Sequence, residues 1–130
     1  ALAVGGGYVV YRIVKQNTKD APGNNLGQLQ INTRNLSYSP SEYGLMAQKM
    51  FLAMDGVGTN ETALFSVLNS MKNRDDMLML IKQFGVKRYG IVTSLWFGQD
   101  LNLIGWLNSK LGGNDLQRAG SIIRAFGIPF

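Results

Sequence analysis

Hydrophobic side chains recur every three or four positions from Ser39 to the C-terminus, which is the spacing of amphipathic helices. The pattern predicts five short helices with polar or glycine residues at their ends. The first begins at Ser39-Pro40-Ser41-Glu42, which has the N-cap serine, first-position proline and third-position glutamate of a capping box. We therefore expect an all-α fold, a compact bundle of about five short helices.

Each later helix also has a residue that can accept a hydrogen bond at its N-terminus. The expected caps are, in chain order, Thr59, Asn73, Asp100 and the pair Asn114-Asp115. Asp75 and Asp76 follow the third cap, where the helix dipole favours carboxylates. Because adjacent helical side chains diverge by about 100°, we interpret them as capping charges and not as a catalytic or metal-binding pair. Residues 86–99 could form a loop, a short helix or a strand.

The apolar faces of the five helices are expected to form the core. They comprise Tyr43, Met46, Met50, Phe51 and Met54, then Leu64, Phe65, Leu68 and Met71, then Met77, Leu80, Ile81 and Phe84, then Leu101, Ile104, Leu107 and Leu111, then Leu116, Ala119, Ile122, Ile123 and Phe126. All six methionines lie in residues 46–79, where they could pack in the core or form an adaptable partner surface. Their helical spacing favours the core.

The first 38 residues have a different composition from the helical domain at 39–130. Residues 1–15 are apolar and glycine-rich and are interpreted as a membrane anchor. The anchor residues are Leu2, Val4, Tyr8, Val9, Val10, Tyr11, Arg12 and Lys15. A spanning helix needs about 20 apolar residues, so a buried strand or helix of a soluble fold is the alternative. The basic flank predicts that the helical body lies on the cytoplasmic or particle-interior side of the membrane.

Residues 16–38 are rich in Gly, Asn and Pro and are interpreted as a polar linker. Within this linker, Leu29, Ile31 and Leu36 are expected to form a short extended segment that packs on the helical body.

Composition removes most kinds of enzyme chemistry. The 130 residues include no His and no Cys, and Glu42 and Glu61 are the only glutamates. Serine–histidine catalysis, histidine-ligated zinc, histidine phosphotransfer and thiolate metal sites are therefore excluded. We expect a non-enzymatic protein that needs no cofactor.

The formal net charge of +5 favours contact with anionic surfaces. The basic residues are scattered, and Lys87-Arg88 is their only adjacent pair, which argues against a dedicated nucleic-acid groove. Lys87, Arg88 and Trp96 are the candidate contacts with an anionic surface. In the other interpretation, Trp96 and Phe97 fill the core of the bundle.

Three stretches resemble one repeat of the annexin family. Met54-Asp55-Gly56-Val57-Gly58-Thr59-Asn60-Glu61 resembles the first interhelical turn, Lys-Gly-x-Gly-Thr-Asp-Glu. Phe97-Gly98-Gln99-Asp100-Leu101 is similar to Tyr-Gly-Arg-Asp-Leu, and Leu107-Asn108-Ser109-Lys110-Leu111-Gly112-Gly113 to Leu-Lys-Ser-Glu-Leu-Ser-Gly. The resemblance covers residues 43–127 and implies a single five-helix repeat, whereas annexins carry four or more.

The resemblance also implies a candidate calcium turn. Its residues are Asp55, Val57, Gly58 and Thr59. However, the family's calcium-capping carboxylate falls at Lys110, and calcium sites need at least one carboxylate among their oxygen ligands. The lysine would repel the ion. In the alternative interpretation, the turn is a tight helix connection in which Gly56 and Gly58 adopt positive φ.

These features predict a non-enzymatic, membrane-anchored structural or adaptor protein, present in many copies in a larger assembly. A lipid-containing phage particle or a bacterial envelope complex would suit it. The expected partners are membrane lipid or neighbouring protein subunits. The alternatives are a calcium-dependent peripheral phospholipid-binding module and a basic nucleic-acid-binding or capsid-interior module.

Overall fold

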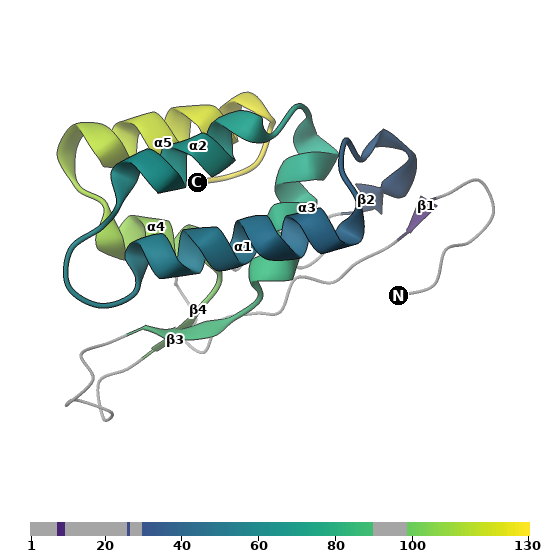
Figure 1. The fold of residues 1–130 in the computed structure, drawn as a ribbon. Coiled ribbons are helices and arrows are strands. Elements are labelled where there is room, and N and C mark those ends of the chain that lie inside the picture. The colour runs from purple at the N-terminus through teal and green to yellow at the C-terminus, as the bar shows by residue number, and fades with distance from the viewer. Residues whose placement is uncertain (1–7, 10–25, 27–29, 90–98) are drawn as a thin grey trace.

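The computed structural model describes residues 8–9, 26, 30–89 and 99–130, and this part of the chain confirms the all-α class. The helices are α1 (Pro40–Met54), α2 (Glu61–Ser70), α3 (Arg74–Phe84), α4 (Leu103–Lys110) and α5 (Gly113–Ala125). Figure 1 shows α2 and α5 side by side on one side of the body and α1 and α4 on the other. Helix α1 packs on both α2 and α3, and α5 packs on α2 and α4.

Two short antiparallel pairs accompany the helices. Strand β1 (Tyr8–Val9) pairs with β2 (Ile31–Asn32), which leads into the 3-10 helix η2 (Thr33–Asn35). Strand β3 (Lys87–Tyr89) pairs with β4 (Gln99–Leu101). The ambiguous stretch after α3 therefore begins as a strand, while residues 90–98 lie outside the described part.

The predicted core is confirmed in its main features. Most of the expected apolar residues are buried, and Met46, Phe51, Leu116, Ile122 and Phe126 are half-buried against them. Trp106 is a core residue that the periodicity did not single out. Its ring packs edge-on against Phe51, Phe84 and Tyr89, with centroids 5.0 to 6.2 Å apart. Its Nε1 donates to the Lys87 carbonyl at 3.1 Å, so the indole joins α4 to β3.

Two of the predicted helix starts are confirmed. The Ser39 hydroxyl accepts from the Glu42 N–H, and the Glu42 carboxylate accepts from the Ser39 N–H, which completes the capping box. The Asn73 side chain accepts from the Asp76 N–H at the start of α3. Gly85 ends α3 with φ +69°, as expected for a glycine after the last turn.

Three predicted helix starts are wrong. Asn60, not Thr59, caps α2, because its side chain accepts from the Ala63 N–H. Asp100 lies in β4 opposite Arg88, and Asn102 caps α4. Helix α5 begins before the predicted pair Asn114-Asp115, with Gly112 at the N-cap position and no side-chain cap.

Part of the predicted linker lies on the helical body. Leu26 and Ile31 are buried, and Leu36 packs against the core. Asp75 holds this segment to α3 by accepting from the Asn32 N–H and the Asn35 amide, both at 2.9 Å. The predicted extended segment is therefore found at Ile31–Asn32, while residue 29 lies outside the described part.

Only two of the predicted anchor residues, Tyr8 and Val9, fall within the described part of the chain, where they form β1. Leu2, Val4, Val10, Tyr11, Arg12 and Lys15 lie outside it. None of the helices in the described ranges has both the length and the apolar run needed to cross a bilayer.

Candidate functional site

The loop between α1 and α2 forms the two-glycine turn that the sequence predicted. Gly56 has φ +84° and Gly58 has φ +80°, a region of backbone conformation that residues with a Cβ rarely adopt. The Asn60 N–H donates to the Ala53 carbonyl at 2.8 Å and closes the loop. Val57 lies between the glycines with its side chain fully exposed.

Lys110 contacts this turn from the far end of α4. Its Nζ donates to the Gly56 carbonyl at 2.8 Å. A positive charge of the protein itself therefore lies at a carbonyl of the candidate calcium turn. Within the part of the chain described here, no three acidic side chains gather as a metal site would require. The candidate turn residues Asp55, Val57 and Gly58 are exposed, and Thr59 is half-buried.

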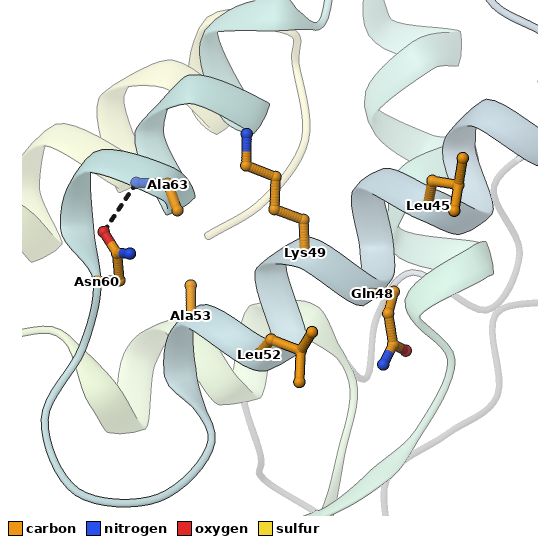
Figure 2. Close-up of a pocket in the computed structure, with 7 residues that line it drawn as sticks. All are labelled: Leu45, Gln48, Lys49, Leu52, Ala53, Asn60 and Ala63. Carbon is orange, nitrogen blue, oxygen red and sulfur yellow. Dashed lines mark hydrogen bonds between the residues drawn. The ribbon is translucent and has the colours of Figure 1, made fainter.

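An apolar face runs along the outer side of α1 to this turn. Leu45 is 72% exposed and Leu52 is 63% exposed. Together with Val57 they are all the large hydrophobic side chains exposed in the described ranges. A depression of about 370 Å³ lies beside the two leucines, and Figure 2 shows the side chains that line it. These are Leu45, Gln48, Lys49, Leu52, Ala53, Asn60 and Ala63. We call them, with Val57, the α1–α2 face.

Three exposed carboxylates lie at the ends of the helices that form the α1–α2 face. Glu42 lies one turn before Leu45, Asp55 follows the end of α1, and Glu61 opens α2; all three are exposed. The side chains of Asp55 and Glu61 have no hydrogen-bond or ion-pair partner within the described residues. Lys49 is the single basic residue among the lining side chains.

Two of the predicted anionic-surface residues, Lys87 and Arg88, are engaged within the fold. The Lys87 ammonium lies over the rings of Phe51 and Phe84, 5.1 and 5.6 Å from their centroids. The Arg88 Nε lies 3.2 Å from an Asp100 carboxylate oxygen in an exposed ion pair across the two strands. Trp96 lies outside the described residues. A shared surface that includes Trp96 therefore stays a prediction.

Asp76 is the one fully buried carboxylate in the described ranges. One of its oxygens accepts from the Tyr43 hydroxyl and the Ser37 N–H, and the other from the Ser37 hydroxyl and the Lys72 N–H. Burial opposes ionisation of Asp76, but these hydrogen bonds outweigh it and hold its pKa below the ordinary value.

Burial, together with the bond to the Asp76 carboxylate and its charge, raises the pKa of Tyr43 well above its ordinary value. Asp75 and Asp76 point to different partners, as their adjacent positions on a helix predicted. An ionised carboxylate with four donors holds the N-terminal segment, α1 and α3 together, and it is poorly suited to general acid–base catalysis.

The α1–α2 face was missed by the sequence analysis, although its signal is present in the chain. Leu45 and Leu52 each follow a core residue of α1 by two positions, Tyr43 and Met50. Two positions turn a helix by about 200°, so the leucines lie opposite the core.

Comparison with protein-family models, curated proteins and solved structures gives no match to this chain.

Proposed function

We propose that this protein is a non-enzymatic structural or adaptor component of a larger assembly. Its N-terminal apolar segment attaches it to a membrane or a neighbouring subunit, and its helical body contacts partner proteins. The observation that carries this proposal is the α1–α2 face, where Leu45, Leu52 and Val57 are exposed together. Large apolar side chains exposed beside a depression are a common mark of an interaction site.

The hydrogen bonds of Asp76 favour a structural role for this buried carboxylate. Asp76 accepts four hydrogen bonds that join the N-terminal segment to α1 and α3, and the chain contains no His or Cys to serve in its place. The order of the five helices, with a two-glycine turn after the first, is consistent with a single annexin-like repeat. The contact of Lys110 with Gly56 favours an attachment that does not need calcium.

Attachment through the N-terminus rests on the composition of residues 1–15, which is apolar up to Tyr11 and then basic. In this arrangement the helical body lies on the cytoplasmic or particle-interior side, next to the basic flank. An apolar N-terminal anchor with a small helical body behind it would suit a many-copy component of a lipid-containing phage particle or a bacterial envelope complex.

Flotation with phospholipid vesicles tests this function. We expect the full chain to float with calcium and with chelator alike. The double variant Val4→Asp/Val10→Asp should stay with unbound protein, because each charge within an apolar anchor opposes insertion by about 2.5 to 3.5 kcal/mol at the membrane centre. The matched control Asn17→Asp/Asn24→Asp adds the same charge in the polar segment and should float. Flotation only with calcium would favour the calcium-dependent alternative, and no flotation in any condition would refute the membrane attachment.

A further inference from the structure

We propose that the α1–α2 face is a docking surface for a protein segment with an apolar side flanked by lysine or arginine. This inference rests on the proposed adaptor function and names the chemistry of the partner. It depends on two properties of the same surface: exposed apolar side chains beside a depression, and a surrounding charge of opposite sign to that of the whole chain.

The apolar part of the face matches the dimensions of an amphipathic partner. Leu45 and Leu52 are seven positions apart on α1, so their side chains lie about 10 Å apart along one helix face. The small side chains Ala53 of α1 and Ala63 of α2 are among those that line the depression beside them. Exposed leucines beside a depression lined by alanine are complementary to a segment that presents its own apolar side chains at helical spacing.

The charged part of the face selects the partner. Glu42 at the start of α1, Asp55 at its end and Glu61 at the start of α2 are exposed carboxylates near its residues in the chain, and Lys49 is the one basic side chain that lines the depression. Lys110 adds a second positive charge at the Gly56 carbonyl, beside Val57. The three carboxylates therefore outnumber the two ammonium groups by one, whereas the whole chain has a net charge of +5. An anionic bilayer and nucleic acid would both be repelled by these carboxylates, whereas basic residues flanking an apolar segment would be attracted.

Lys49 fits this arrangement without opposing it. Figure 2 shows its side chain extended from α1 toward α2, so that its aliphatic part borders the depression. A lysine in such a position packs its methylene groups against an apolar ligand and keeps the ammonium at the margin. It also discriminates against a segment with a lysine at its centre, so that basic residues are favoured only at the two ends.

Fluorescence anisotropy with two synthetic peptides tests the proposal. One peptide is an amphipathic helix with leucine on one side and lysine at both ends, and its twin has glutamate in place of lysine. We expect the full chain to bind the lysine peptide at least tenfold more tightly. Leu45→Gln/Leu52→Gln should weaken that binding at least tenfold, and Asp55→Asn/Glu61→Gln should weaken it several-fold and lower its salt dependence. The control Gln117→Ala/Ser121→Ala, on exposed positions of α5, should bind as the wild type does.

Because Leu45 and Leu52 are exposed, their replacement should leave the far-UV circular dichroism spectrum and melting temperature unchanged, which separates lost docking from lost folding. Equal binding of the two peptides, or binding that survives the leucine substitutions, would overturn the proposal. Self-association or binding to anionic vesicles that depends on Leu45 and Leu52 would also overturn it, with a second copy or a bilayer as the occupant. If the full chain does not float with vesicles but binds the lysine peptide as expected, the membrane anchor is refuted and the docking proposal is retained.

Discussion

Replacing Asp76 by Asn should destabilise the protein more than any exposed substitution. Asn keeps the size of the side chain but turns one oxygen into an NH₂ group. In either orientation this group meets a backbone N–H that cannot rotate away, that of Ser37 or that of Lys72. The remaining bonds also lose the assistance of a negative charge. Together these changes should lower the free energy of unfolding by about 3 to 5 kcal/mol.

Urea unfolding followed by far-UV circular dichroism measures this loss, which corresponds to a fall of roughly 10 to 15 °C in melting temperature for a domain of this size. Tyr43→Phe removes one charge-assisted bond to Asp76 and should cost about 1.5 to 3 kcal/mol. Tyr38→Phe is the matched control, because the Tyr38 hydroxyl donates to the neutral Ser70 carbonyl at 2.6 Å. Its loss should cost only about 1 kcal/mol.

The pH dependence gives a second, independent signature. The pKa of Asp76 is lower in the folded protein than its ordinary value of 3.8. Stability from the ionised carboxylate is therefore present in full above pH 3.8 and is lost as the pH falls from there through the lower native pKa. The difference between wild type and Asp76→Asn should be constant from neutral pH to about pH 5 and shrink in stronger acid. A difference that persists unchanged at pH 3, or that is no larger than for Tyr38→Phe, would refute the hydrogen-bonding argument.

Three other predictions concern the turn and the core. Gly58→Ala should destabilise the protein by about 1 to 2 kcal/mol, because Gly58 has a positive φ. Gly44→Ala in α1 should stabilise the protein by about 0.5 to 1 kcal/mol, because a Cβ there meets nothing within 4 Å. Thermal melts compare the two variants. Calcium at millimolar concentration should leave the melting temperature unchanged, because the Lys110 ammonium lies at the Gly56 carbonyl, and a rise reversed by chelator would contradict this. Trp106→Phe should lower the free energy of unfolding by about 1 to 3 kcal/mol in urea, because the variant loses both ring area and the hydrogen bond to the Lys87 carbonyl. An unchanged urea midpoint would count against the place of Trp106 in the core.

The helix starts that the sequence predicted correctly depend on neighbouring residues only. Ser39, Pro40 and Glu42 lie within four positions, and their hydrogen bonds form inside that segment. Asn60 and Thr59 are both able to cap a helix, and the choice between them depends on the bond from the Asn60 N–H to Ala53 across the turn. That bond joins two positions on either side of the turn, so the residues next to the cap do not reveal it.

The errors at the start of α4 have a long-range cause. Asp100 is a good helix cap by propensity, but it lies opposite Arg88 in β4, and the pairing of β3 with β4 joins residues 87–89 to 99–101. A two-stranded pair of this kind contains too few residues to give a periodic signal. Trp106 was missed for a related reason, because its partners Phe51, Phe84 and Tyr89 come from three separate elements.

The candidate site shows the same division between local and distant information. The two-glycine turn was predicted from its own residues, and the unfavourable effect of Lys110 on calcium from the resemblance. The contact between Lys110 and Gly56, however, joins positions 54 apart in the chain. Because the packing of α4 against the rest of the body sets this contact, only the fold could show that the ammonium binds the turn itself.

Net charge is an incomplete guide to the partner of a small domain, because partners respond to local charge. The value of +5 favoured an anionic surface, with Lys87 and Arg88 as its contacts. In the fold, Lys87 lies over two aromatic rings and Arg88 pairs with Asp100, so both are already engaged. In the described part of the chain, the exposed large apolar side chains lie instead near Glu42, Asp55 and Glu61, which outnumber the ammonium groups of Lys49 and Lys110. The region able to bury apolar area against a partner therefore favours basic flanks, the reverse of what the isoelectric point suggests.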